Sequence, residues 1–357
     1  MKKFLSLLMA VLMMASVLAG CGGDTTTDET EQDANTQDTT TEQTGTNVSP
    51  LTGSGTELKF RTGGEQGTYY GFGTVLAQAV TSSGCNTKVT AVSSNGSQDN
   101  IEQMDYNTAQ LGFVQSDVMD YAYNGTNLFE GYPVTGFSTV AALYMEQVQI
   151  VTCDPEIKTV ADLAGKTVSI GASGSGVFYN AIDILSAYGL DYETDIKAQY
   201  QDFGNSADSL QDGKIDAAFV VAGAPTTAIA SLATAKDTYL VSLDDEHIAK
   251  LQETSPYYEK YVIPEGTYDG VPEATTVAVS AVVIARDDVS EEDVYNFVYT
   301  IFENADSIAA SHDKGKELDL EFAAGVTNVP YHCRRRRSRS LYLPHRCTLR
   351  RPWYCQP

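Results

Sequence analysis

The 357-residue chain has few of the side chains that enzymes most often use for metal and acid–base chemistry. It contains four histidines and six cysteines, and three of the cysteines lie between residues 333 and 357. No C-x-x-C, H-E-x-x-H or G-x-x-x-x-G-K-[ST] pattern occurs, which excludes the common zinc and P-loop signatures. Gly174-Ser175-Gly176 lacks the third glycine of a dinucleotide fingerprint. We therefore expect neither a cofactor nor a metal.

A serine hydrolase is the enzyme class nearest to the sequence, and it is poorly supported. Gly171–Ser175 resembles a nucleophile elbow, but Ser175 stands where the G-x-S-x-G pattern requires glycine. Neither His247 nor His312 lies in a stretch typical of an active-site loop. A nucleophile at Ser173 or Ser175 would therefore have no evident base, and we expect no enzymatic activity.

Positive charge is scarce in the main body of the chain. Between residues 57 and 332 there are 13 Lys and Arg residues against 40 Asp and Glu residues, a net charge of −27. We therefore do not expect this region to bind nucleic acid, and its acidity is typical of a soluble protein outside the cell. The two arginines of this region are Arg61 and Arg286. Arg61 lies within a predicted strand, and we interpret it as structural rather than as a carboxylate clamp.

Long apolar runs are also missing, apart from one at the start of the chain. Lys2 and Lys3 precede the run Phe4–Leu18, which at about fifteen residues is too short to predict a membrane span. Leu18-Ala19-Gly20-Cys21 resembles the lipobox of bacterial lipoproteins, in which the matching cysteine is lipidated and becomes the mature N-terminus. We predict a signal peptide over residues 1–20. Cys21 would then anchor the exported protein to the outer face of the bacterial cytoplasmic membrane.

Residues 21–56 follow as a predicted disordered tether. From Asp24 to Thr56 the sequence has seven acidic residues, no Lys or Arg, and almost no apolar side chains. Such a segment cannot bury enough apolar surface to offset its ordering entropy. Its r.m.s. reach is roughly 30 Å, so the tether would hold the main body close to a membrane surface.

Strand-like and helix-like segments alternate from residue 57 to 332, which predicts an α/β fold with mostly parallel strands. Polar, glycine-rich motifs repeatedly follow the predicted strands, at the sheet edge where ligands bind. The pattern restarts after residue 165, which predicts two lobes that close by a hinge around a ligand in the cleft between them. Lobe one would comprise residues 57–148 plus 277–332, and lobe two residues 149–276. The segments Val140–Thr152 and Thr276–Ala285 would cross between them. The strand candidates are 58–62, 88–92, 110–114, 166–170 and 215–221.

Two predicted helix N-termini, after Gly67 and after Gly174, would present backbone donors to a small carboxylate. Glycines at such positions also suit an ordinary strand–turn–helix connection. Gln115, Asp117 and Glu65 are able to accept an ammonium group, which would favour an amino acid. The candidate ligand-binding residues are Gly67, Thr68, Tyr69, Tyr70, Ser94, Asn95, Ser97, Gln115, Ser116, Asp117, Ser173, Gly174, Ser175, Gly176, Val177, Ala224 and Pro225.

Several motifs in order resemble the TAXI family, the solute-binding proteins of TRAP transporters. The resemblance covers roughly residues 58–332. It implies a type II periplasmic-binding fold, a monomer that delivers its ligand to a cation-coupled TRAP membrane permease, and ligands such as glutamate, glutamine or other small carboxylates. Val177 stands where relatives often carry threonine, so the ligand stays open, and a ligand-sensing lipoprotein is the alternative function. The motifs are Gly67-Thr68-Tyr69-Tyr70 with Gly73, Ser94-Asn95-Gly96-Ser97 with Asn100 and Ile101, Leu111–Asp117, Asp162–Gly171 and Asp212–Phe219.

The sequence departs from this family after Pro330-Tyr331-His332, where relatives continue with Pro-Gly-Ala and an amphipathic helix. Residues 333–357 contain eight of the ten arginines, the only tryptophan and no acidic residue. We interpret this basic tail as the product of a frameshift near codon 333; a real tail for anionic lipid or nucleic acid is the alternative. Cys85 and Cys153 are the remaining cysteines of the main body, and export permits a disulfide between them. We favour two unpaired thiols because both lie in predicted loops.

Overall fold

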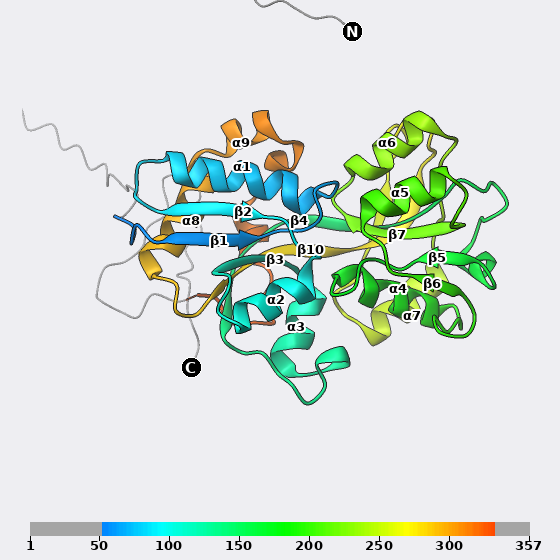
Figure 1. The fold of residues 1–357 in the computed structure, drawn as a ribbon, viewed down its shortest axis with the longest axis horizontal. Helices are drawn as coiled ribbons and strands as arrows, with labels where there is room; N and C mark the ends of the chain where they lie inside the picture. The colour runs from blue at the N-terminus through cyan, green and yellow to red at the C-terminus, as the bar shows by residue number, and fades with distance from the viewer. Residues whose placement is uncertain (1–51, 333–357) are drawn as a thin grey trace, which may run out of the picture. The chain divides into compact units, whose positions relative to one another are not determined.

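Helices cover both faces of one mixed sheet in the computed structural model, which describes residues 52–332 (Figure 1). The predicted signal peptide, Cys21, the tether up to residue 51 and the basic tail lie outside the described residues. In the last part of the predicted tether, the N–H groups of Gly53 and Gly55 donate hydrogen bonds to the carbonyls of Cys85 and Asn86. The predicted lobe boundaries stay predictions.

Three parallel strands form what we call the first half-sheet: β1 (Glu57–Arg61), β2 (Lys88–Val92) and β3 (Leu111–Gln115). In β1, Leu58 and Phe60 are buried while the residues between them are exposed, as expected for a strand with one covered face. β3 is buried at every position, because helices cover both of its faces.

A second half-sheet repeats this plan with β5 (Thr167–Ser169), β6 (Lys197–Gln199) and β7 (Ala217–Ala222). All six residues of β7 are buried. This explains why the sequence shows a continuous apolar run there rather than an alternation.

Two long antiparallel strands, β4 (Phe137–Thr152) and β10 (Ala274–Arg286), join the half-sheets. The order is β2-β1-β3-β10-β4-β7-β5-β6. Both predicted crossing segments are confirmed as strands, although each is longer than expected. Short strands β8 (Tyr239–Leu240) and β9 (Glu259–Ile263) pair with β4 and β10, respectively. The topology confirms the predicted α/β class of the type II periplasmic-binding kind. The prediction of mostly parallel strands is wrong, because β4 and β10 pair antiparallel with all of their neighbouring strands.

The half-sheets run in opposite directions, since β3 pairs antiparallel with β10 whereas β7 pairs antiparallel with β4. Their carboxyl ends therefore meet at the middle of the long strands. Ala281 of β10 pairs with both Gln115 and Tyr144, and Gln147 of β4 pairs with Ala222. This register brings the ends of β3 and β7 to the centre of β4.

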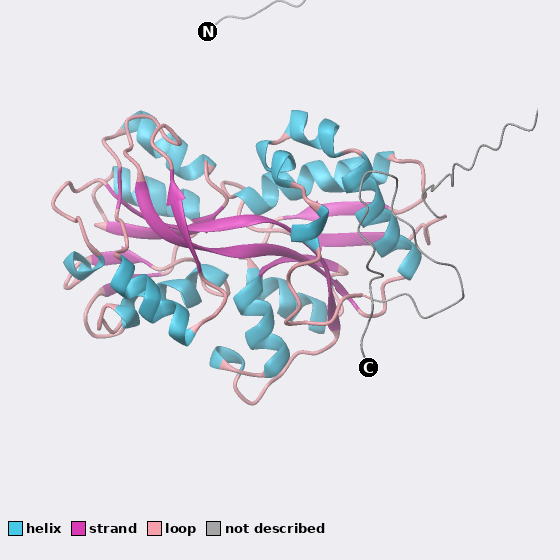
Figure 2. Ribbon diagram, turned by 180° about the vertical axis from the view of Figure 1, so that it is seen from behind, coloured by secondary structure: helices cyan, strands magenta, loops and turns pink. Residues whose placement is uncertain are grey.

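Helices lie on opposite faces of each half-sheet, as Figure 1 and the view from behind in Figure 2 show. Consecutive residues of β3 belong to hydrophobic cores on opposite faces of the sheet. Phe113 packs in the core beneath α1, and Val114 packs in the core beneath α2 and α3. Around the first half-sheet are α1 (Thr68–Ser82), α2 (Ser97–Asp105), α3 (Ser116–Asn124), α8 (Glu291–Glu303), α9 (Ala305–Ser311) and α10 (Leu320–Ala323). Around the second are α4 (Gly176–Ala187), α5 (Phe203–Gln211), α6 (Thr227–Ala235) and α7 (Asp245–Thr254).

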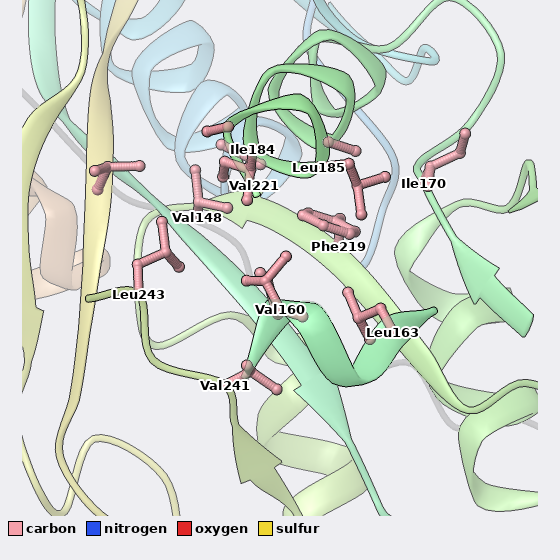
Figure 3. Packing of buried hydrophobic residues seen from close by; sticks show 14 of the residues in the cluster. Val148, Val160, Leu163, Ile170, Ile184, Leu185, Phe219, Val221, Val241 and Leu243 are labelled. Atoms are coloured by element: carbon pink, nitrogen blue, oxygen red, sulfur yellow. The ribbon is translucent and has the colours of Figure 1, made fainter. Parts of the chain in front are cut away.

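The core beneath α4 shows how the second half-sheet is held together (Figure 3). Phe219 of β7 packs with Ile184 and Leu185 of α4 and with Val148 of β4, and all four side chains are buried. Each such side chain contributes about 1.5–3 kcal/mol of burial free energy. The crossing strand is thus part of this core.

Acidic residues mark the starts of two helices: Asp244 caps α7, and Ser290 caps α8 ahead of an acidic first turn. Cys85 and Cys153 are free thiols, as favoured. Within residues 52–332, no helix is both long and apolar enough to cross a membrane.

Candidate functional site

A cavity of about 60 Å³ lies where the carboxyl ends of the two half-sheets meet. Its walls come from the loops after β1, β2 and β5, from the ends of β3 and β7, and from the middle of β4. It is lined by Gly63, Gly64, Gly67, Thr68, Tyr69, Ser94, Asn95, Gly96, Ser97, Gln115, Glu146, Ala172, Ser175, Gly176, Val177, Asp202, Phe203, Val221 and Ala222.

Four helices begin at this cavity: α1 after Gly67, α2 after Gly96, α4 after Ser175 and α5 after Asp202. The first three N-termini have no side-chain cap, whereas the side chain of Asp202 caps α5. Uncapped N-termini combine N–H donors with the positive end of the helix dipole, which favours a bound anion. The sequence predicted two of them, and α2 adds a third.

Backbone conformation and close packing explain the glycines at two of these N-termini. Gly96 has φ +111° and ψ −150°, a combination that is essentially restricted to glycine. Gly176 has an ordinary conformation, but a Cβ built on it would overlap the Oε1 atom of Gln115. The side chain of Gln115 therefore rests directly on the first turn of α4.

Two buried polar atoms at the cavity have no hydrogen-bond partner among the described residues: Gln115 Oε1 and Ser175 Oγ. Gln115 is 2 % exposed and Ser175 4 %. An unsatisfied buried polar group costs about 1–3 kcal/mol, and functional sites are where such costs are tolerated. Both atoms are therefore candidates for direct ligand contact.

Glu146 is the functional candidate that the sequence analysis missed. It lies on β4, is 1 % exposed, and accepts a hydrogen bond of 2.9 Å from the hydroxyl of Tyr69 at Oε2. The Tyr144 hydroxyl donates to Oε1 at 3.5 Å. Burial raises the pKa of Glu146 to about 8. Hydrogen bonds from Tyr69, Tyr144 and Gln115 lower this pKa, but burial outweighs them. The sequence could have indicated Glu146, because it is an acidic residue inside the apolar run 140–152.

Tyr69 is fixed in place by an aromatic neighbour. Its ring stacks on Phe113 of β3, with centroids 4.6 Å apart and planes within 4°. The hydroxyl is thereby directed at Glu146. Burial, and secondarily the charge of Glu146, raise the pKa of Tyr69. Tyr69 therefore acts as a hydrogen-bond donor at neutral pH.

The two sides of the cleft touch each other directly. Thr68 Oγ1 donates to the carbonyl of Gly223 at 2.8 Å, and the N–H of Asp99 donates to the carbonyl of Gly174 at 2.9 Å. Beside the cavity, Asn180 Nδ2 of α4 donates to Asp117 Oδ2 of α3 at 2.9 Å. The structure thus represents a closed cleft.

The arginine and histidine side chains considered in the sequence analysis do not take part in the cavity. Arg61 Nη2 lies 2.6 Å from Asp99 Oδ2, so it is structural as interpreted. His247 stacks on Tyr188 and contacts Asp244, and neither His247 nor His312 lines the cavity. Among residues 52–332, no group of three or more His, Cys, Asp or Glu side chains could hold a metal ion.

The architecture described above has a match among known protein families. The family model described as the NMT1-like family matches residues 60–334. The chain belongs to the NMT1-like family.

Several solved structures are similar to this NMT1-like chain at low sequence identity. A protein from Bordetella bronchiseptica matches with TM-score 0.50 and 15% identity over 76% of this chain and 86% of its own. An alkanesulfonate-binding protein from Xanthomonas axonopodis, bound to MOPS, has TM-score 0.44 and 14% identity, covering 79% and 82%. An amino acid ABC transporter substrate-binding protein from Streptococcus pneumoniae, bound to L-arginine, has TM-score 0.45 and 16% identity, covering 73% and 95%.

Ten of the predicted binding residues of this NMT1-like chain line the cavity, and seven do not. Predicted residues on the cavity wall are Gly67, Thr68, Tyr69, Ser94, Asn95, Ser97, Gln115, Ser175, Gly176 and Val177. Those off the wall are Tyr70, Ser116, Asp117, Ser173, Gly174, Ala224 and Pro225.

Most residues off the wall have other partners in the structure. Ser116 Oγ accepts from the N–H of Ser280, and the N–H of Ala224 donates to Gln147 Oε1. Gly174 and Asp117 hold the cleft closed, whereas Ser173 is exposed. Pro225 lines a separate hollow beside residues 309–314. Of these residues, Gly174 and Asp117 support the site through contacts across the cleft.

Proposed function

We propose that this NMT1-like chain is the extracytoplasmic solute receptor of a TRAP transporter, of the TAXI kind. It would bind a small carboxylate or amino acid in the cavity, close around it, and deliver it to the membrane permease. The observation that carries the proposal is the meeting of three uncapped helix N-termini with the unpartnered oxygens of Gln115 and Ser175 in one cavity.

A carboxylate ligand would have to be held without a cationic side chain. No Lys, Arg or His side chain of residues 52–332 lines the cavity, and the acidic residues on its wall are Glu146 and Asp202. A carboxylate would be stabilised there by helix dipoles and backbone N–H donors, without a full counter-ion. Apolar side chains from Val177, Phe203 and Val221 complete the wall, as is usual in sites for small organic molecules.

The proposed partner and location rest on the resemblance of the sequence motifs to TAXI proteins and on the lipobox at Cys21. A lipid anchor and an acidic tether would keep the receptor at the outer face of the cytoplasmic membrane, near its permease. A ligand-sensing lipoprotein would use the same cavity, so the membrane partner separates the two functions.

Thermal unfolding of the purified full chain tests ligand binding. The panel comprises amino acids, small mono- and dicarboxylates, and an alkanesulfonate. A ligand at 100 times its Kd adds about 2.7 kcal/mol to the stability, a shift of a few degrees. A shift restricted to one class of compound supports the receptor function and identifies that class. A folded protein that responds to none of them contradicts it.

Uptake measurements test the transporter class. The receptor is combined in membrane vesicles with each multi-span transport protein that sequencing finds encoded beside it, and uptake of labelled ligand is followed. Uptake that stops when the cation gradient is collapsed, and that persists without ATP, supports the TRAP assignment. Uptake that requires ATP would instead indicate an ABC permease. Binding without uptake by any neighbouring permease would favour the sensor.

A further inference from the structure

Glu146 has no cationic partner within the described part of the chain. No Lys, Arg or His side chain in residues 52–332 forms an ion pair with it. It is nevertheless 1 % exposed and belongs to the cavity wall. A buried carboxylate without a cationic partner is costly to the fold, so its presence at a ligand cavity indicates a role in binding.

The hydrogen bonds that Glu146 receives favour its ionised form. The hydroxyls of Tyr69 and Tyr144 donate to different oxygens of the carboxyl group, at 2.9 and 3.5 Å. Both phenols therefore orient the group as an acceptor. Two phenol donors do not neutralise the charge of an ionised carboxylate, because they are uncharged. A cationic group of the ligand would supply the missing counter-charge.

Two unpartnered acceptors lie in the same cavity as Glu146. Gln115 Oε1 and Ser175 Oγ are both buried without a partner among the described residues. An ammonium group has three N–H donors and no acceptor. Glu146, Gln115 and Ser175 together provide three acceptors, which matches that requirement.

The cavity therefore offers both donors and acceptors to a ligand. The N-termini of α1, α2 and α4 provide donors for a carboxylate, and Glu146 with its neighbours provides acceptors for an ammonium group. We propose that Glu146 binds the α-ammonium group of an amino-acid ligand, so that the receptor selects amino acids over carboxylates lacking this group. The inference rests on the proposed receptor function and specifies its substrate class.

The acids named from sequence as ammonium acceptors are less suitable. Glu65 is exposed and does not line the cavity. Asp117 is fully buried, but its Oδ2 accepts from Asn180 and the residue lies off the cavity wall. Of these acids and Glu146, Glu146 alone is both buried and on the wall.

The protonation state of Glu146 provides a second way to test its role in binding. Burial raises its pKa to about 8, and the nearby carboxylate of Asp117 adds to the rise. The groups facing it are Tyr69 from α1, Tyr144 from β4 and Gln115 from β3, with the Lys314–Glu317 ion pair beyond Tyr144. A bound ammonium favours the carboxylate, so binding below pH 8 should release a proton.

The test is isothermal titration calorimetry on the full chain with ligand pairs that differ in the ammonium group alone. Suitable pairs are L-glutamate with glutarate, L-alanine with propionate, and L-glutamine with 4-carbamoylbutanoate. We expect the amino acid of the recognised pair to bind at least about 30-fold more tightly than its partner. E146Q keeps the shape of the side chain. It should lower the affinity for the amino acid by a similar factor and change the affinity for the deaminated compound by less than about threefold. E65Q is the matched control and should bind as the wild type does.

The pH profile separates recognition from a structural role. Wild-type affinity for the amino acid should rise with pH up to about 8, by as much as about tenfold per unit, while E146Q should show little dependence. Heats measured in buffers of different ionisation enthalpy count the released proton directly.

Three results would overturn the inference, and they are distinguishable. Equal binding of both members of a pair would show that the ammonium group is not recognised, while the receptor function stands. Unchanged amino-acid affinity in folded E146Q would show that another group binds the ammonium. Absence of binding by any compound in these pairs or in the wider panel would contradict the receptor function itself.

Discussion

Asn180 of α4 and Asp117 of α3 form a buried hydrogen bond of 2.9 Å that joins the two sides of the closed cleft. The second oxygen of Asp117 and the amide oxygen of Asn180 have no hydrogen-bond partner among the described residues. Burial, reinforced by the charge of Asp183, raises the pKa of Asp117 to about 7. This contact therefore depends on pH.

The first prediction concerns D117N and the pH dependence of stability. An acid whose pKa rises from 3.8 to about 7 on folding binds a proton more tightly in the folded state, so its contribution to stability falls as pH rises from about 4 to 7. D117N removes this titration and keeps an acceptor for Asn180. Its melting temperature relative to wild type should therefore increase over this range. E253Q, at an exposed site on α7, should show a constant difference; a constant difference for D117N would contradict the prediction.

A second prediction concerns G176A. Alanine is normally better than glycine in a helix by about 1 kcal/mol. At this position the added methyl group would overlap Gln115 Oε1, so Gln115 would have to leave the cavity wall. We expect the ligand-induced rise in melting temperature to be largely lost. G136A is the control, because no atom lies within 4 Å of a Cβ built there. Wild-type binding by G176A would show that Gln115 is dispensable.

A third prediction concerns the core of the second half-sheet. Phe219 of β7 is 0 % exposed and packs with residues of α4, the helix that begins at the cavity after Ser175. F219A should lower the free energy of unfolding by about 3–5 kcal/mol, measured by urea denaturation. V262A, at a side chain that is 40% exposed, should change it by less than about 0.5 kcal/mol. Similar losses in both variants would mean that this core is loosely packed.

The fourth prediction concerns the gene rather than the fold. Pro330 and His332 still pair with Thr139 at the start of β4, through hydrogen bonds of 2.8 Å each. If a frameshift follows codon 332, one of the other two reading frames should encode a Pro-Gly-Ala ending and an amphipathic helix. Resequencing of the locus checks this. A basic sequence in the verified frame, with neither alternative restoring that ending, would make the tail genuine.

Local structure was largely determined by the sequence. Lys88–Val92 was predicted as a strand with the bounds that the structure shows, and the long apolar segments 140–152 and 276–285 were identified as crossing strands. The helix start predicted after Gly67 is observed, and the one predicted after Gly174 lies one residue later, after Ser175. These features depend on backbone conformation and side-chain periodicity, which neighbouring residues specify.

The assembled site depended on tertiary structure. Glu146 became a cavity residue because β10 and β4 pair in a register that places it between the ends of β3 and β7. Asp117 is two residues from Gln115, yet it begins α3 and faces Asn180 instead of the cavity. Sequence periodicity specifies which face a residue occupies on its own element. Only long-range strand pairing and helix packing decide which faces meet, because those contacts join residues that are far apart in the chain.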